Sequence, residues 1–201
     1  MPSTPLELFG AAGLTPSGVV PWGVSIPVQK SGVYVVSLCR DASSCAGTIA
    51  TCPIWSSAIE NWLTACPALT LDGTRPATAE LQARISEFWI PDEVVVYIGL
   101  AGTSLRNRVG QYYRTPLGAP KPHAGGHFLK TLSNLTNLYV HYAPADDPDA
   151  CEGAMLKAFC GHISPTAKSK LRDPMRPFPF ANLEYPPGTR KRHGLSGTRS
   201  A

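Results

Sequence analysis

The chain has 201 residues, of which 43% are hydrophobic and 16% charged, and its formal net charge is +4. This composition is typical of a globular protein and excludes an intrinsically disordered one. No stretch is apolar over the length that a membrane helix needs, and residues 1–10 lack the basic and apolar order of a signal peptide. We therefore expect a cytoplasmic protein with no membrane partner.

The charge is unevenly distributed along the chain. Residues 94–201 contain 14 Lys or Arg against 6 Asp or Glu, whereas residues 1–93 contain 4 against 8. A basic half beside an acidic half indicates an anionic partner for one face, and nucleic acid is the leading class.

The first elements in chain order lie in an N-terminal arm, residues 1–30, which is rich in Pro, Gly and Ser. We expect it to be extended, with a short helix at Leu6–Ala12. The β-branched and aromatic run Val33–Leu38 then predicts a buried strand, and Val94–Ile98 predicts a second one. Between them, two apolar patterns at helical spacing predict a helical insertion within about residues 39–92.

Beyond the second strand, Ser104–Tyr112 predicts a helix with Ser104 as its N-cap. A turn-rich segment at 115–126 precedes a short predicted helix at His127–Leu135 and a third strand at Leu138–Tyr142. A further helix is expected over Asp149–His162. The remainder is Pro-rich and basic, and predicts a wrapping loop and a frayed tail at 186–201.

Several polar residues suit phosphodiester hydrolysis, which needs a base for the attacking water, cationic stabilisation of the phosphate and a metal or acid at the leaving oxygen. Arg108 can hold phosphate oxygens, and Tyr34 or Tyr112 can act on the water. Glu152 can hold a hard cation such as Mg²⁺.

Two tripeptides, Gly32-Val33-Tyr34 and Tyr97-Ile98-Gly99, resemble those that name the GIY-YIG nucleases. The later functional positions of that family follow in the same order, so the resemblance covers about residues 31–185: these positions are Leu105-Arg106-Asn107-Arg108, Tyr112, Glu152 and Asn182. Arg108 is preferred to Arg106 because Tyr112 follows it by four residues, one turn along the same helix face.

The resemblance implies an α/β domain of the α+β type, with a small three-stranded antiparallel sheet flanked by helices and a helical insertion between its first two strands. It also implies a metal-dependent DNA endonuclease with one Mg²⁺ or Mn²⁺ ion per active site. Glu152 would hold the ion, Tyr34 would assist water attack and Arg108 would bind the phosphate. Tyr112 would share the base role, while Tyr97 and Asn182 would position these groups.

A restriction-type enzyme is the leading biological role, and a repair or mobile-element nicking nuclease is the second. The sequence departs from the family in two places. Leu100 stands where a lysine often follows the second tripeptide, and the insertion is far longer than the usual hairpin. We expect the insertion to determine where the enzyme cuts, or to form a homodimer through apolar faces around Trp62 and Trp89.

Further DNA contacts are expected from basic residues and a histidine outside the motif. These are Arg106, His127, Lys130, Arg190, Lys191 and Arg192.

Structural roles compete with each assignment. Tyr34 and Tyr97 also suit strand packing, Glu152 suits a capping box with Asp149, and Asn182 suits a turn. A catalytically silent nucleic-acid-binding module is therefore an alternative. Another is a zinc-organised interaction domain, although the cysteines form no C-x-x-C pair and we expect reduced thiols: these are Cys39, Cys45, Cys52, Cys66, Cys151 and Cys160.

Overall fold

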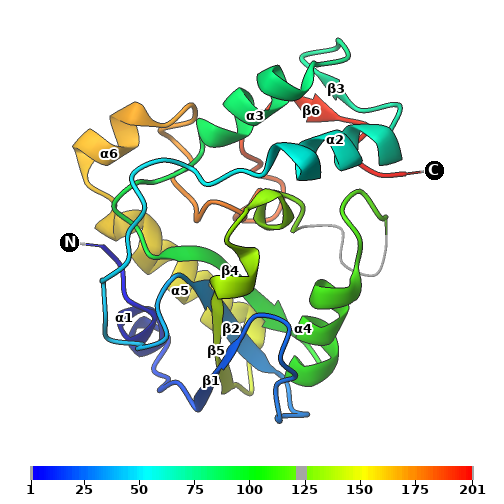
Figure 1. The fold of residues 1–201 in the computed structure, drawn as a ribbon. Coiled ribbons are helices and arrows are strands. Elements are labelled where there is room, and N and C mark those ends of the chain that lie inside the picture. Colours follow the sequence, from blue (N-terminus) through cyan, green and yellow to red (C-terminus); the bar gives the residue numbers. More distant parts are fainter. Residues whose placement is uncertain (1, 121–125, 201) are drawn as a thin grey trace.

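A computed structural model describes residues 2–120 and 126–200. Its centre is an antiparallel sheet of four strands in the order β1-β5-β2-β4 (Figure 1). The fold is α+β, but the sheet has one strand more than expected. Residues 121–125 of the predicted turn-rich segment, which include His123, lie outside the described residues. The four strands are β1 (Gly18–Pro21), β2 (Gly32–Ser37), β4 (Val95–Ala101) and β5 (Tyr139–Pro144).

The additional strand, β1, belongs to the N-terminal arm, which is therefore part of the domain. β1 pairs with β5 along its whole length. The run Val19-Val20 is too short to predict a strand by itself, because Pro21 follows at once. The expected arm helix forms as α1 (Pro5–Ala11), and a capping box between Thr4 and Glu7 starts it.

Helices cover both faces of the sheet. α1 and α5 (Pro148–His162) pack on the face that presents Val33 and Val35. The opposite face, with Tyr34 and Val36, is covered by α4 (Leu105–Arg114), by the 3₁₀ helix η1 (Phe128–Thr131) and by the insertion. All six residues of β2 are buried, because this central strand has neighbours on both edges and helices on both faces.

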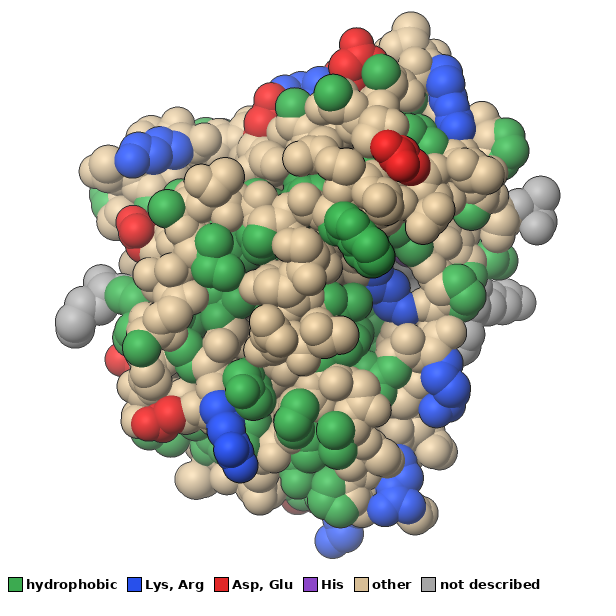
Figure 2. Space-filling model, viewed as in Figure 1, with side chains coloured by type: hydrophobic (Ala, Val, Ile, Leu, Met, Phe, Trp, Pro, Cys, Tyr) green, Lys and Arg blue, Asp and Glu red, His purple; other side chains and the backbone are tan. Residues whose placement is uncertain are grey.

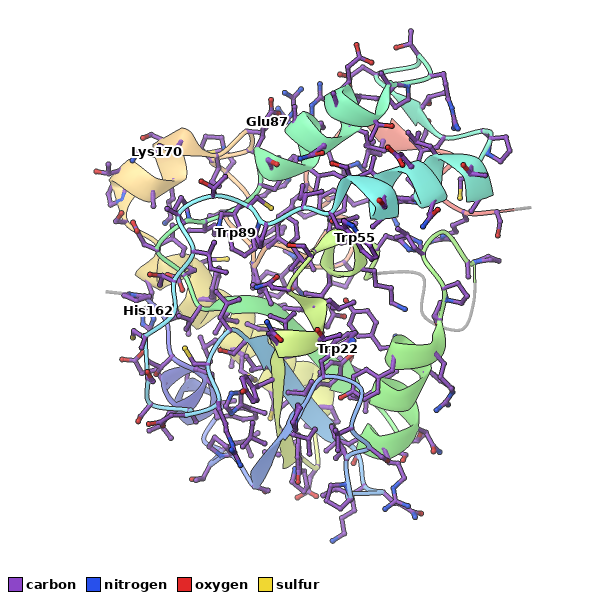
Figure 3. The ribbon with its side chains drawn as sticks, viewed as in Figure 1. Trp22, Trp55, Glu87, Trp89, His162 and Lys170 are labelled. Carbon is purple, nitrogen blue, oxygen red and sulfur yellow. The ribbon has the colours of Figure 1, made fainter. Side chains whose placement is uncertain are left out.

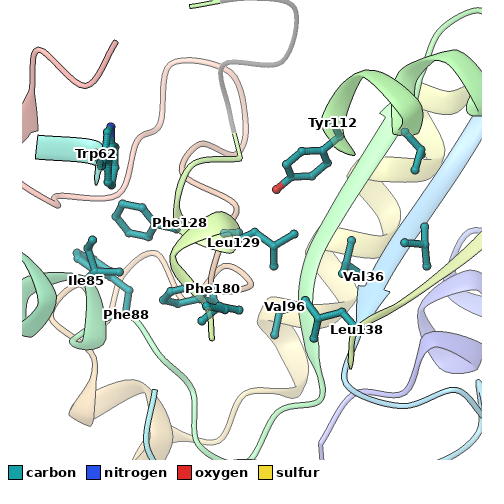
Figure 4. Packing of buried hydrophobic residues seen from close by; sticks show 14 of the residues in the cluster. Val36, Trp62, Ile85, Phe88, Val96, Tyr112, Phe128, Leu129, Leu138 and Phe180 are labelled. Carbon is teal, nitrogen blue, oxygen red and sulfur yellow. The ribbon is translucent and has the colours of Figure 1, made fainter. Parts of the chain in front are cut away.

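The insertion contains the two expected helices, α2 (Ser56–Ala65) and α3 (Thr78–Ser86). They share one hydrophobic cluster with the sheet, and Figure 4 shows Phe128 and Leu129 between the insertion and the strands. Trp62 and Trp89 are 1% and 6% exposed. The expected dimer contact through these two side chains is therefore wrong, since both are buried within the chain.

Three local expectations are corrected. The helix expected at His127–Leu135 forms η1 and a second 3₁₀ helix, η2 (Leu135–Asn137). The expected wrapping loop contains α6 (Pro165–Lys170). The C-terminal tail is not frayed over its described residues, because its strand β6 (Leu195–Ser196) pairs with β3 (Thr70–Leu71) of the insertion (Figure 1).

All six cysteines are free. The Cys39 thiol donates to the Ala46 carbonyl, and the Cys66 thiol donates to the Gly118 carbonyl. Within residues 2–120 and 126–200, no group of three or more His, Cys, Asp or Glu is placed to hold a metal ion. The zinc-organised domain therefore has no ligand set in this part of the chain. Among the same residues, no helix is both long and apolar enough to cross a membrane.

Candidate active site

The two tripeptides lie side by side on β2 and β4, with Tyr34 opposite Gly99 and Val36 opposite Tyr97. A Cβ atom on Gly99 would lie 2.6 Å from the Tyr97 ring and 2.8 Å from the Tyr34 ring. A Cβ atom on Gly32 would overlap the Ala143 carbonyl oxygen of β5. Both motif glycines are thus required by close approach of neighbouring groups.

Three tyrosines form a continuous aromatic group on this face. The ring centroids of Tyr34 and Tyr97 are 5.9 Å apart, and those of Tyr97 and Tyr112 are 5.3 Å apart. Burial raises the pKa of Tyr97 to about 12, with a further contribution from the negative charge of Glu152. Burial also raises the pKa values of Tyr34 and Tyr112 well above 10. In this structure the three hydroxyls are therefore protonated at neutral pH.

The three tyrosines differ in their access to solvent. Tyr97 is partly buried, whereas Tyr34 and Tyr112 are 1% and 0% exposed. The Tyr112 hydroxyl donates to the Gly126 carbonyl at 3.3 Å. Trp22, labelled in Figure 3, packs edge-on against the Tyr112 ring at 5.2 Å. Tyr112 is therefore enclosed by the arm and by Gly126, and Tyr97 is the member of the group that water can reach.

Arg108 lies on α4, which begins where the Ser104 side chain accepts a hydrogen bond from the Asn107 N–H at 3.2 Å. Its positive charge lowers the pKa values of Tyr34, Tyr97 and Glu152, against the larger effect of burial on each. Arg108 is thus close enough to act on all three groups.

Arg106, by contrast, faces the N-terminal arm. Its guanidinium donates to the carbonyls of Ile26 and Pro27, each at 3.1 Å. The structure therefore brings Arg108, and not Arg106, to the tyrosines and Glu152.

Glu152 has no capping role. The N-cap of α5 is Asp147, whose carboxylate accepts from the Ala150 N–H at 3.0 Å, so Glu152 lies in the second helical turn. The capping box with Asp149 is therefore wrong. Burial, with a smaller contribution from the charge of Asp149, raises the pKa of Glu152 to about 7 although Arg108 opposes this. Carboxyls with such a raised pKa are rare in proteins as a whole, and those that occur are often found at functional sites.

Asn182 makes hydrogen bonds with the outer edge of β4, which has no neighbouring strand on that side among the described residues. Its Oδ1 accepts from the Ile98 N–H at 2.9 Å, and its Nδ2 donates to the Ile98 carbonyl at 2.7 Å. The adjacent Ala181 N–H donates to the Val96 carbonyl at 2.9 Å. The amide thus replaces a neighbouring strand, and Asn182 positions the strand that carries Tyr97.

A cavity of about 590 Å³ joins part of this set. Tyr97, Glu152 and Asn182 line it, together with Trp62 of the insertion and His127 before η1. The other expected catalytic residues are not among those that line the cavity: these are Tyr34, Arg108 and Tyr112.

The residues expected to contact DNA differ in availability. Arg192 is exposed, and the Arg190 side chain is 71% exposed although it pairs with Glu184 at 2.7 Å. Lys191 is 4% exposed, and its ammonium donates to the carbonyls of Pro179 and Phe180. A phosphate contact by Lys191 is therefore wrong, because its ammonium is buried and donates to carbonyls within the chain.

Lys130 and His127 are also engaged within the chain. The Lys130 ammonium donates to the Thr115 carbonyl and lies 5.8 Å from the centre of the Tyr112 ring. His127 is 3% exposed and lines the cavity. On the face shown in Figure 2, Lys and Arg side chains are scattered singly rather than gathered into one patch.

The cavity also contains residues that sequence reasoning missed, namely Trp62, His193 and Arg199. Trp62 was expected on an apolar helix face, and the two tail residues had no spacing that points to a site. They meet where β6 of the tail pairs with β3 of the insertion and the Trp62 indole N–H donates to the Thr198 carbonyl. No local pattern contains that pairing.

The cavity lining includes a carboxylate, Glu152, that could hold a magnesium ion. Mg²⁺ keeps several water ligands and is commonly bound by one or two carboxylates together with substrate phosphates. Glu152 supplies one carboxylate beside a cavity, which meets that requirement.

No family model, curated protein or solved structure matches the chain. Membership of the GIY-YIG family therefore stays a prediction from the motif residues.

Proposed function

We propose that the chain is a Mg²⁺- or Mn²⁺-dependent endonuclease that hydrolyses phosphodiester bonds in duplex DNA, with restriction-type cleavage. The observation that carries the proposal is the meeting of Tyr97, Glu152 and Asn182 in one cavity, within reach of the charge of Arg108. A half-buried carboxyl with a pKa of about 7, an arginine and a tyrosine pair are the groups that this hydrolysis uses.

Glu152 would hold the metal ion, and the bound ion supplies charge stabilisation for the leaving 3′ oxygen. Arg108, which is half-buried on α4, binds the phosphate that is attacked and stabilises its transition state. Because Tyr97 is the accessible tyrosine, it orients the attacking water, and Tyr34 supports it from behind. The charge of Arg108 favours the phenolate of both tyrosines.

The proposal is tested by incubating supercoiled, linear and single-stranded DNA with the protein and Mg²⁺ or Mn²⁺, followed by mapping of the ends. We expect metal-dependent cuts that leave a 3′ hydroxyl, and none with Glu152→Gln. Undiminished cleavage in excess chelator contradicts the metal-dependent mechanism. Retained binding without cleavage supports the silent-module alternative.

Cleavage of both strands requires two copies, because one compact site cuts one strand at a time. We therefore expect a homodimer on duplex DNA, with a contact outside the buried Trp62 and Trp89. Sedimentation with and without duplex measures this. A monomer in both conditions, together with nicked circular products, supports the nicking-nuclease alternative.

A further inference from the structure

Beyond Tyr97 and Glu152, the cavity ends in a wall of aromatic side chains. Trp62 of α2 and Phe128 of η1, each 1% exposed, both line it, and Figure 4 shows the two rings next to each other. The Trp62 indole N–H donates to the Thr198 carbonyl at 3.0 Å, so the ring is held by the tail. A flat, partly apolar ligand group fits such an end better than an ion does.

Two histidines place polar groups at the same wall. His127 Nδ1 accepts from the Gly118 N–H at 3.3 Å, and His193 Nδ1 accepts from the Leu195 N–H at 3.0 Å. In each neutral ring the proton is therefore on Nε2. His127 Nε2 is buried and has no hydrogen-bond partner within residues 2–120 and 126–200. A buried donor of this kind is unfavourable until an acceptor arrives.

The charge of the two rings distinguishes between possible acceptors. Burial lowers the pKa of His127 to about 4, and burial also lowers the pKa of His193. Both rings are neutral at neutral pH, and neutral N–H donors suit the carbonyl oxygen or ring nitrogen of a nucleobase. The cations that suit a phosphate, Arg190 and Arg199, line the same cavity on exposed segments of the tail.

We propose that the wall formed by Trp62, His127, Phe128 and His193 receives one nucleobase turned out of the DNA stack beside the bond that is cut. This inference rests on the proposed nuclease function and adds a base-recognition pocket to it. Enzymes that act on extruded bases read them by hydrogen bonds and by packing against aromatic groups. A cavity of about 590 Å³ is within the ordinary range for small-ligand sites. Because Trp62 belongs to the insertion, the insertion takes part in choosing the cleavage site.

A mismatch scan tests the pocket. Each base pair around the mapped cut is replaced in turn by a mismatch, and Kd is measured with Glu152→Gln, which binds without cutting. A mismatch already lacks the pairing that extrusion must break. We expect one position at which the mismatch tightens binding about tenfold or more, equivalent to ~1.4 kcal/mol.

The double variant Glu152→Gln/His127→Phe keeps an aromatic ring but removes the donor, and should lose this gain. Glu152→Gln/His162→Phe is the matched control, since His162 is exposed and outside the cavity, and it should keep the gain. If His127→Phe does not fold, His193→Phe replaces it. Cleavage with equal Kd values at every mismatch overturns the pocket alone. Absence of both binding and cleavage overturns the nuclease function as well.

Discussion

Glu152→Gln distinguishes a functional carboxyl from a structural one through its effect on stability. The pKa of Glu152 is about 7 in the folded chain, against a usual value of 4.5, so the folded state holds the proton more tightly than the unfolded state. The stability that this group contributes is fully present below pH 4.5 and is lost as the pH rises through 7. Glutamine keeps the volume and does not ionise. The variant should therefore be more stable than the wild type above pH 7.

The difference between these two pKa values corresponds to ~3 kcal/mol, at ~1.4 kcal/mol for each tenfold change in proton affinity. Glu152 is partly exposed, so solvent screening reduces this figure to ~1–3 kcal/mol. In a chain of this size ~1 kcal/mol shifts Tm by roughly 2–4 °C. We therefore expect Glu152→Gln to melt roughly 2–12 °C above the wild type at a pH of about 8.

Thermal unfolding followed by circular dichroism between about pH 5 and 8 measures this difference. Glu60→Gln on α2 is the matched control, because Glu60 is exposed and should change Tm little. Loss of DNA cleavage together with a gain in Tm that grows with pH is the expected result. A Glu152→Gln variant that melts below the wild type at a pH of about 8 refutes the reasoning, since the carboxylate would then stabilise the fold.

Four other substitutions separate chemistry from positioning. Asn182→Ala removes both hydrogen bonds to Ile98, so denaturant unfolding should show a loss of ~1–3 kcal/mol alongside lower activity; unchanged stability contradicts the positioning role. Arg108→Ala should lower kcat/KM at least about a hundredfold with little change in Tm. Arg106→Ala should mainly lower Tm, because it removes the hydrogen bonds from Arg106 to the N-terminal arm. The reverse ranking would exchange the roles of the two arginines. Gly99→Ala should displace the Tyr34 and Tyr97 side chains and destabilise the fold by ~1–3 kcal/mol in unfolding experiments. A fully active and stable variant would contradict the requirement for glycine at this position.

The parts of the fold that the sequence predicts are those with a strong local pattern. The runs that form β2 and β4 are apolar and β-branched, and the insertion helices repeat apolar residues every three or four positions. The spacing from Arg108 to Tyr112 also selected the arginine that the structure brings to the tyrosines. In each case neighbours along the chain carry the information.

The missed features depend on distant partners. β1 exists because β5 supplies its hydrogen bonds, and the tail is ordered around Lys191 because the ammonium finds two carbonyls at Pro179 and Phe180. A basic run gives no sign of such burial. The cavity was equally inaccessible to sequence reasoning, since the insertion and the tail build its aromatic wall about 130 residues apart along the chain.

These long-range contacts join the tail to the motif through a short chain of hydrogen bonds. Lys191 holds the segment before Asn182 by its carbonyls, and Asn182 holds Ile98, the neighbour of Tyr97 on β4. Two residues beyond Lys191, His193 lines the aromatic wall. We therefore expect a change at Lys191 to displace both the wall and Tyr97, and to leave Arg108 on α4 and Glu152 on α5 in place. In the proposed nuclease, α4 and α5 would provide the charged groups for hydrolysis, and the tail and insertion would select which DNA reaches them.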